Sequence, residues 1–142
     1  MNRLSNLSIR KVVGFSLLEL LIAVGIIGIL AAIVYPRYQD MVIRSHRADA
    51  TTLLMDAAQS LERCYTRFYA YDDNRCTASP VGRVSEGGFY RITDDSDIEE
   101  TSFRLVAVPQ GRQENDTECG NFTLDHRSAR GVSGSGSADN CW

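Results

Sequence analysis

Residues 15–34 read FSLLELLIAVGIIGILAAIV, and this stretch decides the architecture of the chain. Only Ser16 and Glu19 are polar within it. A helix of this length, at about 1.5 Å per residue, spans about 30 Å, which is the thickness of the hydrocarbon core of a bilayer. A cleaved secretory signal has a shorter apolar run that ends at a small-x-small site, and Ala31-Ala32-Ile33 matches such a site poorly. The sequence therefore predicts a membrane anchor that is retained.

Charge is distributed unevenly around this anchor. Residues 1–14 carry Arg3, Arg10 and Lys11 and no acidic residue. Residues 37–142 carry 12 arginines and 17 acidic residues, a net charge of −5. A folded part this acidic is a poor candidate for sequence-independent binding to DNA, which needs clustered cations against the phosphates. No nucleic-acid partner is therefore expected.

Beyond the anchor, apolar residues recur at steps of four and three, which predicts that the helix continues to about Tyr69. The stripe consists of Ala50, Leu54, Ala57, Leu61, Cys64 and Phe68. Pro36 is expected to interrupt this helix without ending it, because proline is tolerated in membrane-spanning helices. The anchor is therefore assigned to residues 15–36, and the head of the protein begins at residue 37 with an amphipathic helix.

The remaining residues of the head favour a loop followed by strands. Residues 70–88 contain Asp, Pro and Gly clusters and are expected to form the loop. Strand-like runs follow at 89–93, 102–108 and 119–125, and a fourth short run lies at 127–132. A helix followed by strands predicts an α+β fold, with the helix covering one face of a small antiparallel sheet of about four strands.

The chain has four cysteines, Cys64, Cys76, Cys119 and Cys141, and no CxxC motif. An even count, wide spacing and an upstream membrane segment favour disulfides in an oxidising compartment over a metal site. Four cysteines allow three pairings. Cys64 lies on the apolar stripe near the end of the helix, so the spacing favours a bond to Cys76 that would pin the following loop.

Glu19 is the most informative polar residue. A carboxylate inside a membrane span costs roughly 2.5–3.5 kcal/mol on insertion scales, and such residues are functional by default. The apolar run contains no cation that could pair with it. Its partner is therefore expected to be another chain, or a new amine made by cleavage nearby. The alternative is an acid that is tolerated near the membrane edge.

The sequence Gly14-Phe15-Ser16-Leu17-Leu18-Glu19, between a short basic leader and the apolar run, resembles the N-terminus of type IV prepilins. Gly28 and Pro36 also stand where that family has them. The resemblance implies that a membrane aspartyl prepilin peptidase removes residues 1–14 by cutting after Gly14, and then methylates the amine of Phe15. It also implies that neighbouring subunits pair this amine with Glu19, so that neither charge is left uncompensated in an apolar bundle.

Shorter stretches of the head resemble minor pilins of the same family, namely Ser102–Pro109, Cys119–Leu124, Arg130-Gly131 and Asp139–Trp142. The resemblance implies the pilin fold, with one disulfide that closes a C-terminal loop and joins Cys119 to Cys141. It implies a structural minor pilin that primes or takes part in pilus assembly, with no active site, cofactor or metal. The implied partners are other pilin subunits, the prepilin peptidase and the inner-membrane assembly machinery.

The expected location is the bacterial inner membrane, with one span and the head in the periplasm, and later the extracellular pilus. Basic residues flank both ends of the span, so the positive-inside rule does not orient it, but the cysteines favour an oxidising side for the head. The alternatives within the class are a major pilin, a type II secretion pseudopilin and a DNA-uptake pilin. A membrane-anchored periplasmic enzyme or binding module is the alternative from another class, and it would need a convergent titratable cluster.

Several charged residues are weaker candidates for function. Asp94, Asp95, Asp97, Glu99 and Glu100 form an acidic run that offers oxygen ligands for Ca²⁺, but without EF-hand spacing a solvated loop is favoured. Arg37, Arg44 and Arg47, near Asp40 and Asp49, are expected to pair with acids of neighbouring subunits rather than form only a solvated face.

Two histidines and two glycosylation sequons carry no predicted function. His46 and His126 are expected at the surface. The glycosylation sequons at Asn115 and Asn121 are short enough to arise by chance, and they carry no assignment.

Overall fold

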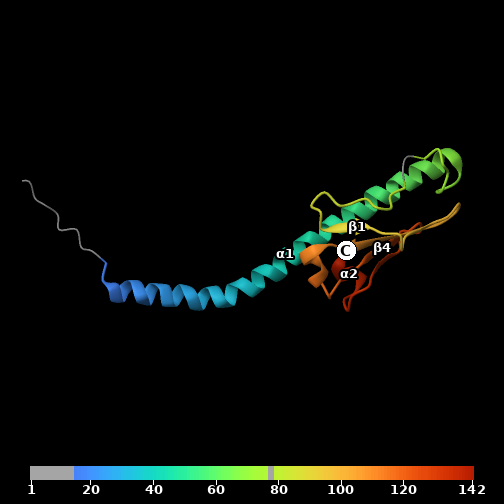
Figure 1. The fold of residues 1–142 in the computed structure, drawn as a ribbon. Helices are drawn as coiled ribbons and strands as arrows, with labels where there is room; N and C mark the ends of the chain where they lie inside the picture. Colours follow the sequence, from blue (N-terminus) through green and yellow to red (C-terminus); the bar gives the residue numbers. More distant parts are fainter. Residues whose placement is uncertain (1–14, 77–78) are drawn as a thin grey trace, which may run out of the picture. The chain divides into compact units, whose positions relative to one another are not determined.

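The computed structural model describes residues 15–76 and 79–142 (Figure 1). The chain divides into two units, Met1–Tyr38 and Gln39–Trp142. The predicted leader, including Gly14, lies outside the described residues, so its cleavage stays a prediction.

Within the first unit, the chain is helical and apolar. Helix α1 extends over Leu17–Phe68, with Pro36 inside it as predicted. Every residue from Phe15 to Tyr38 is exposed. An 18-residue window of α1 has a mean hydropathy of 2.8, and none of that window is buried. Among the described residues, α1 is therefore the one helix that is long and apolar enough to cross a membrane.

Within the second unit, one face of α1 is buried. Its buried residues are Arg47, Ala50, Leu53, Leu54, Ala57, Leu61 and Cys64. Five of them belong to the predicted stripe, Arg47 and Leu53 are additional, and Phe68, the last predicted member, is only half-buried. The helix ends where Tyr69 adopts a left-handed conformation (φ 59°) while its N–H donates to the Tyr65 carbonyl at 2.8 Å. A residue in the left-handed region cannot continue a right-handed helix, so α1 stops here, although this conformation costs a residue with a Cβ about 1–2 kcal/mol.

The strands form one antiparallel sheet of five strands in the order β1-β3-β4-β5, with β2 also paired to β3. The strands are β1 (Tyr90–Ile92), β2 (Asp97–Ile98), β3 (Phe103–Pro109), β4 (Phe122–Asp125) and β5 (Arg130–Val132). The α+β fold and the predicted strands are confirmed, and the sheet has one strand more than the predicted four. The additional strand is β2, which has two residues, too few for an alternating pattern to be visible in the sequence.

The core of the second unit lies between α1 and the sheet. Leu54, Tyr90, Ile92, Leu105 and Phe122 have the largest hydrophobic side chains that are fully buried there. In the register of β3 and β4, Leu105 lies opposite Leu124 and Ala107 lies opposite Phe122. The rings of Tyr90 and Phe122 meet edge to face at 5.5 Å. Full burial of one such side chain stabilises a fold by about 1.5–3 kcal/mol.

Two disulfides close the loops at either end of this core. Cys64 is bonded to Cys76, with 5.6 Å between the Cα atoms, and Cys119 is bonded to Cys141, with 5.8 Å. Both pairs are those expected from the sequence. The second bond fastens the short helix α2 (Ala138–Cys141) beside β5. Each bond contributes about 3 kcal/mol in the chain-entropy account of loop closure.

Candidate functional site

The first candidate surface is the exposed apolar helix of the first unit. Phe15 is 87% exposed and Leu17 is 76% exposed. A run of about 20 exposed apolar residues far exceeds what a soluble surface carries, so it requires a lipid or protein partner. The predicted assembly residues Glu19, Gly28 and Pro36 all lie on it and are exposed. Glu19 stands in the first turn of α1, where the helix dipole favours a negative charge.

The second candidate site lies in the head, where a buried ion pair joins Arg47 of α1 to Asp116. The guanidinium of Arg47 donates from Nε to Oδ2 of Asp116 and from a terminal nitrogen to Oδ1, both at 2.8 Å. The same terminal nitrogen donates to Glu118 at 2.7 Å. The Arg47 and Asp116 side chains are only 10% and 2% exposed. Such a two-pronged pair inside a protein is geometrically specific.

This ion pair perturbs the groups that form it. The hydrogen bond from Arg47 holds the pKa of the Glu118 carboxyl below its ordinary value. The hydrogen bond to Asp116 raises the pKa of the Arg47 guanidinium, against the opposing effect of its burial. Arg47 and Glu118 are therefore charged at neutral pH, and the contact between them is ionic rather than a neutral hydrogen bond.

A hydrogen-bond network extends from this pair through Gln113 on the short helix η1 (Gly111–Asn115). The Gln113 amide nitrogen donates to the Ile43 carbonyl at 3.0 Å and to the Tyr90 hydroxyl at 2.9 Å. Its amide oxygen accepts from Nδ1 of His46 at 3.2 Å. Burial raises the pKa of Tyr90 to about 12, so the hydroxyl stays protonated. The network therefore joins α1, β1 and η1.

The structure corrects the expectation for Arg47. Its side chain pairs with acids of its own chain, at sequence separations of 69 and 71 residues. It is therefore not available to acids on neighbouring subunits. Arg44 remains open to that role, because its side chain is 67% exposed and its contact to Glu118 is a longer 3.9 Å. Arg37 and Asp40 are exposed, and Asp49 is half-buried and accepts a hydrogen bond from the Gly87 N–H at 3.2 Å.

Both histidines are half-buried rather than fully at the surface. The ring of His46 stacks on Phe89 with 3.5 Å between centroids, and His126 lies edge-on to Phe103 at 6.3 Å. Neither contact was predicted, because a lone histidine in a polar stretch carries no periodic signal. The residues that the sequence reasoning missed altogether are Gln113 and Asp116, whose roles depend on contacts far along the chain.

Among the described residues, the carboxylates of the acidic run do not gather into a group that could hold a metal ion. There, the one group of ligand atoms close enough to hold a metal ion belongs to Asp116, Glu118 and Cys119. Both carboxylates are engaged by Arg47, and Cys119 is in a disulfide. The acidic residues of the run 94–100 do not belong to this group, and their side chains are exposed around β2.

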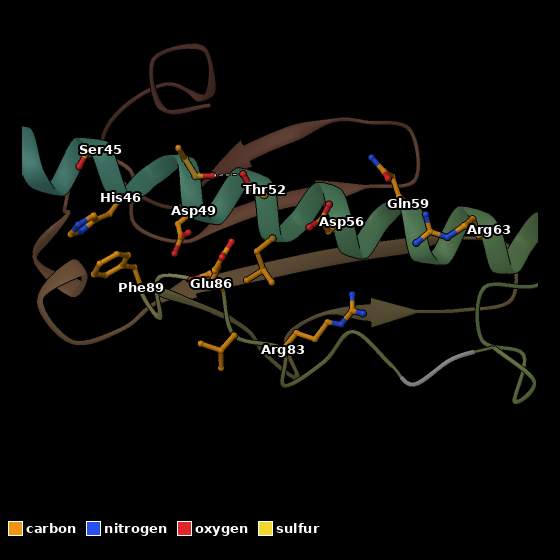
Figure 2. Close-up of a pocket in the computed structure, with 14 residues that line it drawn as sticks. Ser45, His46, Asp49, Thr52, Asp56, Gln59, Arg63, Arg83, Glu86 and Phe89 are labelled. Atoms are coloured by element: carbon orange, nitrogen blue, oxygen red, sulfur yellow. Dashed lines mark hydrogen bonds between the residues drawn. The ribbon is translucent and has the colours of Figure 1, made fainter.

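A polar groove of about 760 Å³ lies between α1 and the segment 83–89 (Figure 2). We call it the α1 groove. The helix side carries Asp49, Asp56 and Arg63, and the facing segment carries Arg83 and Glu86. Its charged side chains line a recess and do not converge on one point, so the arrangement suits contact with another macromolecule better than catalysis on a small molecule.

A long N-terminal helix, apolar in its first part and packed on a small antiparallel sheet in its second, with a C-terminal disulfide, defines the type IV pilin class. Comparison with known proteins agrees. Residues 10–35 match the prokaryotic N-terminal methylation motif. Residues 36–123 match the family described as type IV minor pilin ComP, DNA uptake sequence receptor. That match covers more than half of the chain, which therefore belongs to this minor pilin family.

Individual relatives carry similar descriptions. The chain is 35% identical to a fimbrial protein of Moraxella nonliquefaciens over 80 residues, which are 56% of this chain and 52% of that protein. It is 43% identical to a probable minor fimbrial protein of Dichelobacter nodosus over 58 residues, 39% of this chain and 35% of that one. The matches thus span about half or less of these relatives. A solved type IV pilin from Shewanella oneidensis is 36% identical, with a TM-score of 0.44, covering 70% of this chain and 97% of that one.

Truncation of Arg47 should destabilise the head. Arg47→Ala leaves the Asp116 carboxylate buried without its cation, which costs about 3–5 kcal/mol. Urea unfolding of the detergent-solubilised protein, followed by circular dichroism, measures this loss. Arg112→Ala is the control, because Arg112 is exposed and its loss should change the unfolding free energy by less than about 0.5 kcal/mol. Equal midpoints for the two variants would show that the ion pair does not hold the head together.

The head should also lose stability in acid. Because the pKa of Glu118 is lower in the folded protein than in the unfolded chain, its contribution is present above about pH 4.5 and is lost as the pH falls through the folded pKa. Glu118→Gln should therefore flatten the fall in unfolding midpoint between neutral pH and about pH 3. Glu86→Gln, at an exposed carboxylate with no ion pair among the described residues, should keep the wild-type profile. Parallel profiles for all three proteins would contradict the assignment.

Proposed function

We propose that this protein is a structural minor pilin that takes part in the assembly of type IV pili. The observation that carries the proposal is the exposed apolar part of α1, joined in one chain to a head of the minor pilin family. The exposed apolar helix needs a bilayer before assembly and the apolar helices of other pilins afterwards. Its partners are therefore other pilin subunits, and its path leads from the inner membrane, with the head in the periplasm, to the pilus.

The proposal includes maturation by a prepilin peptidase and delivery by the inner-membrane assembly machinery. Support comes from the methylation motif, which matches residues 10–35 and therefore covers the proposed cleavage point after Gly14. Cleavage there makes Phe15 the first residue and gives it the amine that is methylated. Phe15 is exposed at the start of the helical segment, as a terminus that enters an apolar bundle would be.

Processing should be visible in the mass of the mature protein. In cells that contain a prepilin peptidase, the chain should lack its first 14 residues and carry a methyl group on Phe15. Gly14→Glu should block cleavage, because a charged side chain replaces the smallest residue at the cut. Intact-protein mass spectrometry measures the mass of the mature protein in sheared pili and the mass of the uncleaved variant in isolated membranes. A chain that still begins at Met1 in assembled pili would contradict this maturation.

Glu19 is proposed to pair with the Phe15 amine of a neighbouring subunit. The two residues stand four positions apart at the start of α1, and no cation lies within the apolar run. A carboxylate and an ammonium that enter an apolar bundle together are each compensated, whereas either one alone costs several kcal/mol. Assembly, rather than folding of the head, is therefore where Glu19 acts.

Glu19→Ala should separate assembly from folding. The variant should reach the inner membrane at wild-type levels or above, because a carboxylate in the span is removed. Its share in sheared pili should fall at least about tenfold, since the Phe15 amine enters the bundle unpaired. Immunoblots of the two fractions measure both levels, with Asp40→Ala as control at an exposed acid beyond the apolar run. Equal recovery of Glu19→Ala in both fractions would show that this acid is only tolerated.

Other roles for a protein of this class fit less well. A calcium-dependent pseudopilin would favour free carboxylates that converge on an ion, whereas the convergent group found among the described residues has both carboxylates engaged by Arg47 and its cysteine in a disulfide. A major pilin would differ in its amount in sheared pili. A minor pilin is scarce there, yet its deletion still lowers the number of pili that the cells make. The family and fold are those of structural pilins, and we propose that the chain has no catalytic activity of its own.

DNA binding is a second candidate function, since the matched family is described as a DNA uptake sequence receptor. One observation favours it. Arg63, Arg67 and Arg75 line one small cavity, and Arg75 stacks over the Phe68 ring at 4.2 Å. Cations beside an aromatic ring suit a nucleic acid. The net charge of −5 over residues 37–142 opposes it, because the acids repel phosphates over the rest of the surface.

A mobility shift decides between the two functions. We expect the detergent-solubilised protein to leave duplex DNA unretarded at physiological salt, because of its net negative charge. Retardation that Arg67→Glu removes and Arg112→Glu retains would instead assign DNA binding to the three-arginine cavity. Repeating the titration at low and high salt would then report how many phosphates are contacted.

A further inference from the structure

Beyond β1, the segment 82–85 extends the sheet by one further row. The Arg83 carbonyl accepts a hydrogen bond from an N–H of β1, and the Ser85 N–H donates to a carbonyl of β1, both at 2.9 Å. These two bonds enclose an antiparallel bridge between Val84 and Arg91. In this arrangement the enclosed pair exchanges no hydrogen bond of its own, so the Val84 N–H and C=O point away from β1. Val84 therefore stands on an outer edge of the sheet.

This edge is open. Within residues 15–76 and 79–142, neither Val84 nor Glu86, two positions further along, makes a main-chain hydrogen bond to another main-chain group. The Val84 side chain is 46% exposed, and among the described residues after Tyr69 it is the one large hydrophobic side chain that is exposed. An unpaired main-chain edge is a template on which a further strand can form. The exposed valine gives such a strand an apolar contact as well.

Charged side chains of opposite sign lie beside the two ends of this edge. Figure 2 shows Asp49 and Glu86 towards one end of the α1 groove and Arg63 and Arg83 towards the other, with Asp56 between them. Among the described residues, none of these side chains belongs to an ion pair. A partner that fits the edge therefore carries a cation near Glu86 and an acid near Arg83.

We propose that this edge accepts an extended segment of a partner protein, which adds one antiparallel strand beside residues 83–86. The central residue of that strand is apolar and exchanges two main-chain hydrogen bonds with Val84. The residue after it lies opposite Arg83 and is acidic, and the residue two positions before it lies opposite Glu86 and is cationic. The partner segment therefore reads cation, any residue, apolar residue, acid.

The form and direction of the partner follow from the main-chain groups that are free. A helix cannot take this place, because its own N–H and C=O groups are bonded within the helix. An antiparallel strand satisfies both groups of Val84 with a single residue of its own, whereas a parallel strand needs two residues. Main-chain bonds of this kind supply affinity, and the flanking side chains supply specificity.

Short synthetic peptides test the pairing with the detergent-solubilised full-length protein. The probe is acetyl-Thr-Lys-Thr-Val-Glu-Thr-amide, and nuclear magnetic resonance should show a saturable shift of the Val84 amide. The same peptide N-methylated at its valine lacks the donor to the Val84 carbonyl and should bind at least about tenfold more weakly. The charge-swapped peptide acetyl-Thr-Glu-Thr-Val-Lys-Thr-amide has the same composition and should bind at least about threefold more weakly.

Variants of the protein test the same contact from the other side. Val84→Pro removes the edge donor and should weaken binding at least about tenfold, whereas Val84→Thr keeps the donor and should stay within about twofold of the wild type. Circular dichroism checks that each variant is folded. Where Val84→Pro is not, the N-methylated peptide, which leaves the protein unchanged, decides. Arg83→Glu combined with Glu86→Arg should reverse the preference between the two charged peptides.

The proposal is overturned if the Val84 amide does not shift with the probe at concentrations up to about 5 mM. Equal affinities for the two charged peptides would overturn it too, since the flanking charges would then select nothing. Shifts confined to α1 would assign the peptide to the helix instead of the sheet edge. The proposal does not rest on the assembly function, because purified protein is measured, so a protein absent from pili would leave it standing.

Discussion

The pair between Arg47 and Asp116 is the interaction on which the organisation of the head depends. It binds α1 to the segment between η1 and β4, and its neighbour Cys119 carries the disulfide to α2. The Asp116 carboxylate also accepts the Cys119 N–H at 3.2 Å. One guanidinium thus fixes the helix, the connection after η1 and, through the disulfide, the end of the chain. Apolar packing sets the distance between helix and sheet, and this pair sets where along the helix the sheet is held.

The elements of regular structure could be predicted because their signals are local. The apolar run, the four-and-three stripe and the alternating residues of β3 each lie within one stretch of sequence. The contacts of Arg47, Gln113 and Tyr90 could not be predicted, because they join residues 23 to 71 positions apart and involve polar side chains with no periodicity. An arginine at position 47 looks the same in the sequence whether it meets solvent, a neighbouring subunit or a buried carboxylate. β2 was missed for the opposite reason, since two residues are too short to show a pattern.

The head and the anchor use one helix for two kinds of contact. In the first unit, apolar side chains cover all sides of α1, as suits a helix surrounded by lipid or by other apolar helices. In the second unit, the same helix has one buried face, which carries Arg47 beside its apolar residues and contributes to the core of the head. One continuous helix therefore provides an apolar surface for lipid or other helices and, further along the chain, one side of the core of the head.

The order of elements along the chain has a consequence for biosynthesis. The stripe from Ala50 to Cys64 is made early, but its partners on β3 and β4 lie about 40 to 75 residues later. The stripe therefore stays uncovered until most of the head has been synthesised, and long loops must close before any of its burial is gained. Folding of the head is accordingly a late event, and the growing chain needs protection from aggregation during the interval in which its amphipathic helix has no sheet to cover it.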